Sequence, residues 1–442
     1  MNPNTSAWVP TPPSLLTDHY ELTMLQAALH NGTAQRRSVF EVFSRRLSSG
    51  RRYGIVAGTG RFLEGLEQFR FHETQLEFLE STGVVDHTTA QWLADFRFRG
   101  NIDGYAEGDA WFPHSPVLRV EGSFAEACVL ETYILSVLNY DSAVASAASR
   151  MTSAARGRPC LEMGARRAHE EAAVAAARAA AIAGFTGTSN LEAGYRYGVP
   201  TIGTAAHSFT LLHDSEEDAF RAQLASQGVG TTLLVDTYDV EHAVRTAVEL
   251  AGPELGAVRL DSGDLVIQAT RVRELLDSLG NTNTRITVTS DLDEHAIASL
   301  AAAPVDAYGV GTRLVTGSGV PTSSMVYKLV ARENSSGQME PVAKKATGKG
   351  SVGGRKTALR RRDHHGVATH EIVGVDIVPT NDGDDRPLME AFVRDGEILE
   401  GWTGPAAVQQ ARDRHAATMA ELPRTASRLS EGDAVIPTVL ES

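Results

Sequence analysis

Short apolar segments alternate with polar clusters seven times between Cys160 and Thr312. The segments lie at 160–163, 182–185, 199–202, 233–235, 257–260, 286–288 and 307–308. Each is followed by glycines, hydroxyls or charged side chains. Strands that end at polar loops, with helix-length spacers between them, are typical of an α/β barrel, which presents these loops at one rim. The pattern therefore predicts a barrel-like domain with a site at its rim.

Helical and alternating patterns flank this region on both sides. Apolar residues at helical spacing predict helices within 15–31, 63–69, 73–81, 124–140, 143–156, 170–183 and 405–420. Shorter apolar stretches predict strands within 38–43, 108–122, 371–377 and 388–393. We expect an α/β protein with a flexible tail at 1–14, an N-terminal domain at 15–157, the barrel at 158–332 and a C-terminal α+β region at 333–442.

The stretch 344–362 holds eight basic residues and is rich in glycine. Such a composition predicts a mobile, solvated loop. The alternative is a flap that closes over a polyphosphate.

The composition limits the classes of partner. The 442 residues carry a net charge of −14, and the sequence pI is about 5.5. Nucleic acid and anionic membrane both require a basic face, so we expect neither as a partner. A hydrophobic fraction of 42% supports a full core, and no apolar run approaches the roughly 18 residues of a membrane span.

Cysteine usage and the N-terminus bear on location. Cys128 and Cys160 are the only cysteines, and neither belongs to a C-x-x-C pair, so we expect no structural metal site. So few cysteines fit a reducing compartment. Residues 1–14 lack the basic and apolar regions of a secretory signal. We therefore expect a cytoplasmic protein.

Charged side chains cluster after the segment 257–260. Arg259 and Asp261 are two residues apart, so on a strand both side chains face the same way. Asp261 and Asp264 could bind sugar hydroxyls or a hydrated Mg²⁺ ion, with Gly263 allowing a tight turn between them. The alternative is a buried ion pair followed by a helix N-cap.

A histidine follows another predicted strand end. His207 is flanked by small residues and by the hydroxyls of Thr204 and Ser208. An imidazole in this setting can act as an acid or base, or as a nucleophile toward a phosphoryl group. The ordinary alternative for a lone histidine is a packed or solvated side chain.

Phosphate-binding features occupy the first and last strand ends. The glycine-rich segment 309–312 ends at Thr312 and follows the last predicted strand, where barrel enzymes often bind phosphate. Ser290 and Asp291 follow the strand before it. Of Arg166 and Arg167, we expect one to reach inward to an anion and the other to point outward. The rim therefore suits an anionic, phosphorylated ligand.

The segment 233–239 superficially resembles the diphosphate-sugar motif of type I phosphoribosyltransferases. That motif has adjacent acids followed by a Thr-Gly-rich loop, whereas here the acids are separated and no such loop follows. We interpret Asp236 as a barrel strand end, with a functional and a structural role equally open.

Six segments occur in the order found in nicotinate phosphoribosyltransferases. They are 16–20 (LTDHY), 163–167 (MGARR), 187–190 (GTSN), 203–208 (GTAAHS), 259–265 (RLDSGDL) and 309–312 (GVGT). The chain resembles this family from about Leu15 to Lys356. The resemblance implies an N-terminal α/β sandwich domain completed by C-terminal segments, an incomplete seven-stranded α/β barrel, a small C-terminal α+β extension, and a homodimer.

The resemblance also implies a reaction. Nicotinate and phosphoribosyl diphosphate would give nicotinate mononucleotide and diphosphate in NAD salvage. ATP hydrolysis would be coupled through a phosphohistidine at His207, with Mg²⁺ present and Asp261 as the second catalytic residue. Nicotinate would be bound by Tyr20 of the neighbouring subunit, Thr204, Arg259 and Ser189. The ribose and its phosphates would be bound by Arg166, Asp264, Ser290, Asp291, Gly311 and Thr312, with Ser208 close to the site.

Four other classes of protein share parts of this pattern. Nicotinamide phosphoribosyltransferases resemble this chain but have an aspartate where Ser189 stands, and an aspartate would repel nicotinate. Quinolinate enzymes share the barrel, but they need more basic residues and lack the phosphorylatable histidine. A non-catalytic phosphosugar-binding protein on the same barrel is the alternative outside enzymes. An aldolase-type barrel would need a lysine at a strand end, and none of the seven ends carries one.

Overall fold

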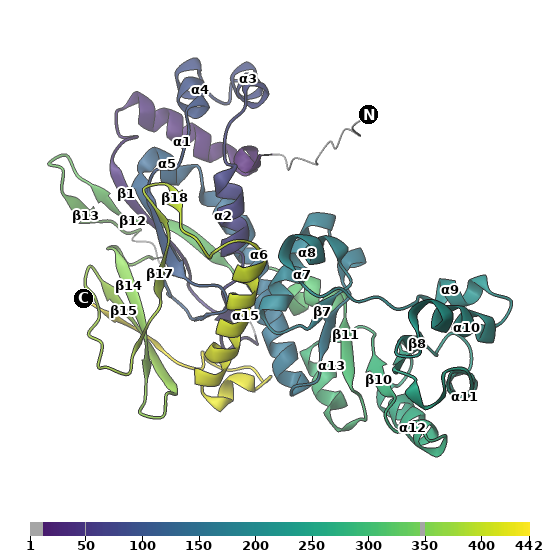
Figure 1. The fold of residues 1–442 in the computed structure, drawn as a ribbon. Coiled ribbons are helices and arrows are strands. Elements are labelled where there is room, and N and C mark those ends of the chain that lie inside the picture. Colours follow the sequence, from purple (N-terminus) through teal and green to yellow (C-terminus); the bar gives the residue numbers. More distant parts are fainter. Residues whose placement is uncertain (1–11, 49, 345–349) are drawn as a thin grey trace. The chain divides into compact units, whose positions relative to one another are not determined.

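The computed structural model describes residues 12–48, 50–344 and 350–442 (Figure 1). The chain forms two compact units. Unit 1 is Met1–Ser142, Thr322–Ala426 and Glu431–Ser442, and unit 2 is Ala143–Pro321 with Ser427–Ser430. Most of the tail predicted at 1–14 lies outside the described residues, whereas Pro13–Leu16 forms a short 3-10 helix (η1) in which Ser14 is buried.

A seven-stranded sheet forms the centre of unit 1, and its paired strands are antiparallel. Its order is β13 (Met339–Pro341), β12 (Met325–Glu333), β1 (Arg37–Ser44), β5 (Leu118–Ser123), β3 (Asn101–Tyr105), β17 (Met389–Arg394) and β18 (Glu397–Ile398). C-terminal strands thus complete a sheet that the N-terminal segment begins. Almost every residue of β1 is buried, so this central strand does not alternate between buried and exposed side chains.

Helices of unit 1 supply the other half of its apolar core. They are α1 (His19–His30), α2 (Thr59–Glu67), α3 (Glu73–Ser81), α4 (His87–Ala94), α5 (Phe124–Cys128) and the start of α6 (Glu131–Ala155). Leu25, Phe62 and Ile134 from three of them join Val42 of β1 in one buried cluster. The single helix expected over 124–140 is two helices, because α5 begins at a Ser123 capping box and ends at Cys128.

The prediction of a mobile loop over 344–362 is wrong for its second half. Residues 345–349 lie outside the described residues, but Lys356–Arg362 is a strand (β14) and not a mobile loop. Arg360 is fully buried and donates to Glu371 Oε2 at 2.8 Å. Lys356 Nζ donates to Glu41 Oε2 at 2.7 Å. The basic composition was misleading because the acidic partners come from segments distant in sequence.

Strand β14 belongs to a four-stranded sheet. Its order is β16 (Arg386–Pro387), β14, β15 (Ala368–Val375) and β19 (Thr438–Glu441). The predicted C-terminal helix is confirmed as α15 (Gly404–Glu421). A two-stranded ladder joins β2 (Gly54–Ile55) to β4 (Ala110–Trp111).

Unit 2 is built on a curled sheet of six parallel strands (Figure 1). Their order is β7 (Gly187–Thr188), β6 (Cys160–Glu162), β11 (Ala307–Val310), β10 (Arg285–Val288), β9 (Ala257–Leu260) and β8 (Thr232–Leu234). Each neighbouring pair is parallel. The helices between and after these strands are α7 (Glu170–Ile182), α8 (Leu191–Tyr197), α9 (His207–Leu212), α10 (Glu216–Gln227), α11 (Val240–Ala251), α12 (Leu265–Ser278), α13 (Glu294–Ser299) and α14 (Thr312–Val315). The predicted α/β architecture with an incomplete barrel is confirmed.

The count of seven strands is not confirmed. The segment expected as a strand at 199–202 contributes only one isolated parallel bridge, between Thr188 and Thr201. The apolar run at 182–185 is also not a strand, because Ile182 closes α7 and β7 starts only at Gly187.

Glycine lets β11 pass close to its neighbours. A Cβ atom at Gly309 would lie 2.4 Å from Thr289 Cγ2 and 2.7 Å from Met163 Sδ. Gly309 is therefore required by packing within the strand, although the sequence suggested that it belonged to a loop. None of the helices within the described ranges is both long enough and apolar enough to cross a membrane.

Candidate active site

The carboxyl ends of four parallel strands surround one cavity in unit 2. It has a volume of about 220 Å³ and is lined by Met163, Arg166, Arg167, Arg259, Asp261, Thr289, Ser290, Asp291, Gly309, Gly311 and Thr312. These residues follow or end β6, β9, β10 and β11. Parallel strands bring their carboxyl ends to the same edge, which is why clusters distant in sequence meet here.

Arg259 is the central cation of this cavity. Its Nη2 donates to Asp261 Oδ1 at 3.0 Å, and its Nε donates to Thr289 Oγ1 at 2.9 Å. Nη1 makes only long contacts of 3.4 Å, with Thr204 Oγ1 and the Ala205 carbonyl oxygen. The guanidinium is thus fixed on two sides, with Nη1 least engaged. The expectation that Arg259 and Asp261 face the same way is confirmed.

Asp261 is held in its ionised form. Burial alone would raise the pKa of this carboxyl, but a hydrogen bond from the Thr289 hydroxyl and the charge of Arg259 outweigh burial and lower it. The carboxylate therefore remains negative at the rim, where it can stabilise positive charge on a reacting sugar.

His207 begins helix α9 beside this carboxylate. Its Nδ1 lies 3.1 Å from Thr237 Oγ1. Its Nε2 lies 3.9 Å from Asp261 Oδ2 and 3.9 Å from Asp236 Oδ1. The side chain is 41% exposed, so the ring is both positioned and accessible.

Asp236 links the histidine to the Asp261 turn. Its Oδ2 accepts from the backbone N–H of Asp261 at 2.8 Å and from Ser262 Oγ at 2.7 Å. Its Oδ1 is buried and has no hydrogen-bond partner among the described residues. Asp236 therefore lies beside His207 and holds the Asp261 turn, and these contacts fit both the functional and the structural role that the sequence left open. No sequence pattern gave a reason to assign a role to Thr237 or Thr289, although Thr289 directly follows β10 and Thr237 lies three residues after β8.

Both arginines of the turn after β6 contribute to the lining of the cavity and both are exposed, so the expectation that one reaches inward and the other points outward stays a prediction. Arg166 and Arg167 lie in the 3-10 turn η2 (Ala165–Arg167), which follows β6. Two guanidiniums at one cavity form a strong site for a diphosphate or phosphate.

A second part of the lining fits a phosphate group. Gly311 and Thr312 lie at the start of α14, where backbone N–H groups point out of a helix end. Ser290 takes a φ of 147°, which non-glycine residues rarely adopt, and Asp291 follows it on the lining.

Six residues proposed for the site do not line this cavity, although two of them, Thr204 and His207, lie beside Arg259 and Asp261. Asp264 caps α12, accepting from the Ile267 backbone N–H at 3.1 Å, as in the structural alternative. Ser189 is exposed in the loop after β7, and Ser208 is exposed in the first turn of α9. Tyr20 belongs to unit 1, where the residue is 43% exposed.

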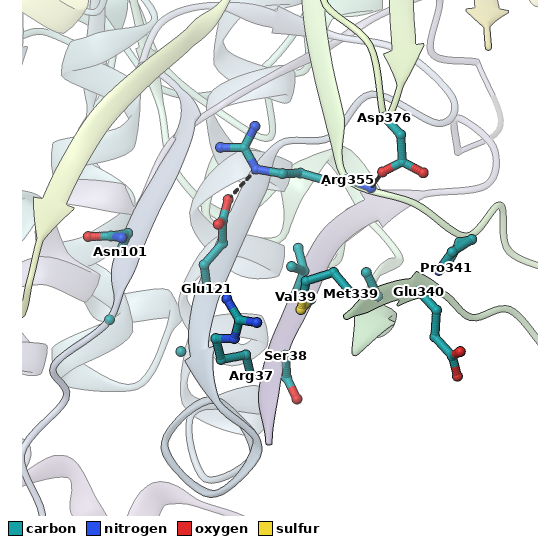
Figure 2. A pocket seen from close by; sticks show the side chains of 13 residues that line it. Arg37, Ser38, Val39, Asn101, Glu121, Met339, Glu340, Pro341, Arg355 and Asp376 are labelled. Atoms are coloured by element: carbon teal, nitrogen blue, oxygen red, sulfur yellow. Dashed lines mark hydrogen bonds and ion pairs between the residues drawn. The ribbon is translucent and has the colours of Figure 1, made fainter. Parts of the chain in front are cut away.

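A second cavity, of about 400 Å³, lies in unit 1 (Figure 2). Residues of β1, β3, β5, β12 and β13 line it. Figure 2 shows Arg355 directed at Glu121, with Nε donating to Oε1 at 2.7 Å. Arg37 likewise donates to Glu333 at 3.2 Å. Each of these arginines is already paired with a carboxylate, so this cavity is a weaker binding site for an anion than the rim of unit 2.

The half-barrel and its rim define the class of protein. Parallel strands that end in arginines, a glycine-rich helix start and a histidine between carboxylates are typical of an α/β-barrel protein that binds a phosphorylated sugar.

Comparisons with known proteins identify the family. Residues 15–139 match the nicotinate phosphoribosyltransferase (NAPRTase) N-terminal domain, and residues 159–365 match the NAPRTase family. The nicotinate phosphoribosyltransferase pncB1 of Mycobacterium tuberculosis is 54% identical over 436 residues, covering 97% of this chain and 95% of that protein. The Bacillus subtilis nicotinate phosphoribosyltransferase is 36% identical over 367 residues, covering 80% and 74%. This chain belongs to the nicotinate phosphoribosyltransferase family.

Solved structures agree with this fold. The crystal structure of human nicotinic acid phosphoribosyltransferase has a TM-score of 0.81 at 25% identity, covering 96% of this chain and 97% of that chain. The nicotinate-nucleotide pyrophosphorylase from Pyrococcus furiosus shares the fold, with a TM-score of 0.75 at 24% identity, covering 94% and 98%.

Proposed function

We propose that this chain transfers the phosphoribosyl group of phosphoribosyl diphosphate to nicotinate, giving nicotinate mononucleotide and diphosphate. This is a pentosyl transfer in NAD salvage. The observation that carries the proposal is that Arg166, Arg259, Asp261 and Thr312 line a single cavity. Family membership supplies the identity of the substrates.

The chemistry matches the charges at the rim. The C–O bond between the anomeric carbon and the diphosphate breaks, and the pyridine nitrogen forms a bond with that carbon. The departing diphosphate is anionic, and Arg166 and Arg167 neutralise it. The ribosyl centre becomes positive, and Asp261 stabilises it. Alignment of the weak pyridine nucleophile then lowers the barrier further.

Arg259 is proposed to bind the nicotinate carboxylate. Its Nε and Nη2 are taken by Thr289 and Asp261, while Nη1 makes only contacts of 3.4 Å. A carboxylate that approaches Nη1 and the Thr204 hydroxyl would gain a charge-assisted hydrogen bond. Nicotinamide lacks the charge, and the hydroxyl of Ser189 in place of an aspartate also favours the acid.

ATP coupling through His207 is part of the same proposal. An imidazole nitrogen would attack the terminal phosphorus of ATP, and the bond from that phosphorus to the bridging oxygen would break to release ADP. The phosphorylated ring would then stand beside the carboxylates of Asp236 and Asp261. Repulsion between these charges favours later hydrolysis, which would release phosphate and complete the cycle.

Mg²⁺ is proposed to enter with the polyphosphate substrates. Such an ion needs only one or two protein carboxylates, because phosphate oxygens and water fill its other positions. Asp261 and Asp291 line the cavity and fit this requirement. Bound Mg²⁺ would neutralise charge on the diphosphate.

A homodimer is proposed as the working form, with Tyr20 acting in the neighbouring subunit's site. The exposed ring of Tyr20 offers a face on which a pyridine could stack. A cytoplasmic location is also proposed, since Cys128 and Cys160 are both free thiols.

The decisive test is a comparison of substrates. Purified protein would be assayed with nicotinate, nicotinamide and quinolinate, each with phosphoribosyl diphosphate and with or without ATP. We expect nicotinate mononucleotide to form fastest, with stimulation by ATP. Binding of phosphoribosyl diphosphate without diphosphate release from any of the three would instead identify a non-catalytic phosphosugar-binding protein.

A further inference from the structure

A buried carboxylate lies just behind the cavity, and the proposed chemistry does not use it. Glu162 is the last residue of β6, and only 1% of its surface is exposed. Within the described ranges it has no ion-pair partner. Burial is the largest influence on its pKa and raises it. Burying an acid without a cation partner costs free energy, so we expect the contacts of Glu162 to serve the site.

One carboxylate oxygen of Glu162 holds the arginine turn. Its Oε1 accepts from the backbone N–H of Gly164. The Gly164 carbonyl oxygen in turn accepts from the Arg167 N–H at 2.8 Å, which closes the turn that carries Arg166 and Arg167. A Cβ atom at Gly164 would lie 2.3 Å from Val315 Cγ1, so the turn also packs tightly against α14.

The other oxygen holds the Ser189 loop. Glu162 Oε2 accepts from the hydroxyl of Thr188, which is fully buried at the end of β7. The same Thr188 oxygen accepts from the Asn190 N–H at 3.0 Å. The backbone carbonyl oxygen of Glu162 accepts from the Ser189 N–H at 2.8 Å. Three consecutive residues of this loop are thus tied to one glutamate.

We propose that Glu162 is a positioning residue that fixes the arginine turn and the Ser189 loop relative to each other. The inference rests on the proposed function, in which the turn binds the diphosphate and the loop faces the pyridine. Glu162 is not among the residues that line the cavity. Its two carboxylate contacts, with the Gly164 N–H and the Thr188 hydroxyl, set the distance between the turn that binds the diphosphate and the loop that faces the pyridine. This distance lets the pyridine nitrogen and the anomeric carbon meet.

Loss of one or both contacts of the Glu162 carboxylate should affect the Michaelis constants differently. Glu162→Ala removes the contacts with Gly164 and with Thr188 and should raise KM for nicotinate and for phosphoribosyl diphosphate by about tenfold each. Thr188→Val removes only the contact with the Thr188 hydroxyl, so KM for nicotinate should rise about fivefold while KM for phosphoribosyl diphosphate stays within about twofold. Glu162→Gln keeps the shape and an acceptor for Gly164, so both constants should stay within about threefold.

Thr284→Val serves as the matched control. Thr284 is equally buried and donates to the Leu255 carbonyl oxygen at 2.9 Å, but it precedes β10 and so lies at the opposite end of the strands from the rim. Its loss should lower the thermal midpoint without changing either KM. A merely structural role for Glu162 predicts the same behaviour for Glu162→Ala.

Calorimetric binding of phosphoribosyl diphosphate separates this inference from the proposed function. If the wild-type protein fails to make nicotinate mononucleotide, the function is wrong, but weaker binding by Glu162→Ala and unchanged binding by Thr188→Val would still support the positioning role. Unchanged substrate constants and binding in a folded Glu162→Ala would overturn it. If that variant does not fold, equal rises of both constants in Thr188→Val would overturn it.

Discussion

His207 and Asp236 face each other across 3.9 Å, from Nε2 to Oδ1, and that oxygen is buried without a hydrogen-bond partner among the described residues. The second carboxylate oxygen of Asp236 is fixed by the N–H of Asp261 and the hydroxyl of Ser262. The unpaired oxygen is therefore held toward the imidazole by the turn that also carries Asp261. A negative charge at this place favours a ring that becomes positive during phosphoryl transfer.

The first prediction concerns phosphorylation of His207. His207→Ala should abolish labelling of the protein by radiolabelled ATP, together with the stimulation of product formation by ATP. The measurement is acid-labile label retained on the protein. His213→Ala is the control, because His213 follows the same helix and, within the described part of the chain, its Nδ1 hydrogen-bonds only with the Phe209 carbonyl oxygen, at 2.8 Å. Label that survives in His207→Ala would move the phosphorylation to another residue.

The second prediction tests the charge of Asp236. In Asp236→Asn the amide oxygen can still accept from Asp261 and Ser262, which turns the NH₂ group toward His207. The geometry is kept while the negative charge is lost, so the rate of protein labelling by ATP should fall about tenfold or more. Rapid-quench labelling measures this rate. Labelling at the wild-type rate would mean that the carboxylate only holds the turn.

The third prediction concerns substrate choice by Arg259. Arg259→Ala should raise KM for nicotinate by about 10- to 100-fold, because a charge-assisted hydrogen bond is lost, and should affect nicotinamide much less. Steady-state kinetics with both substrates measure the difference. Arg221→Ala removes an exposed arginine paired with Glu217 and should change neither constant. Equal effects on both substrates would assign Arg259 to the sugar.

The rim was predictable because it depends on strand order, whereas the flanking contacts were not. Arg259 and Asp261 were expected on one face from their spacing alone, and their 3.0 Å contact agrees. The direction of Arg167 could not be read in this way, because η2 is a 3-10 turn, in which a strand's alternation does not apply. In the sequence, Asp236 looked like any other residue at a strand end. Its contact with the Asp261 turn arises because β8 pairs with β9 in the sheet.

Charge was the least reliable guide to the fold. The basic composition of 344–362 suggested a solvated loop, but β14 buries Lys356 and Arg360 against Glu41 and Glu371. These partners are separated from the strand by up to 315 residues. No local pattern could reveal such pairs, since composition records the charges and omits their neighbours.

The fourth prediction follows from the lowered pKa of Asp261. Burial raises this pKa, but the Thr289 hydrogen bond and the Arg259 charge outweigh it. Because the folded-state pKa lies below the unfolded value, the ionised group stabilises the protein above the unfolded pKa, and this contribution is lost as pH falls through the folded pKa. Thr289→Val removes one of the interactions that lower the pKa of Asp261, so this pKa should rise and the acid limb of the kcat/KM profile should move to higher pH. An unmoved limb in the pH–rate profile would contradict this assignment.

The fifth prediction concerns the buried network of unit 1. Arg360 and Glu371 are both fully buried and joined at 2.8 Å, and Arg360 also donates to Glu421 at 3.2 Å. Arg360→Met leaves Glu371 as an uncompensated buried charge and should reduce the free energy of unfolding by about 3–5 kcal/mol. Urea unfolding measures the change.

The double variant Arg360→Met with Glu371→Gln separates charge from packing in this network. With the unpaired carboxylate replaced by a neutral amide, the cost of the buried charge disappears, and a large part of the stability should return. Glu217→Gln, which breaks an exposed pair with Arg221, is the control and should change stability by about 0–1 kcal/mol. If the double variant is as unstable as Arg360→Met alone, the loss comes from packing around the guanidinium, which lies 5.1 Å from the centre of the Phe112 ring.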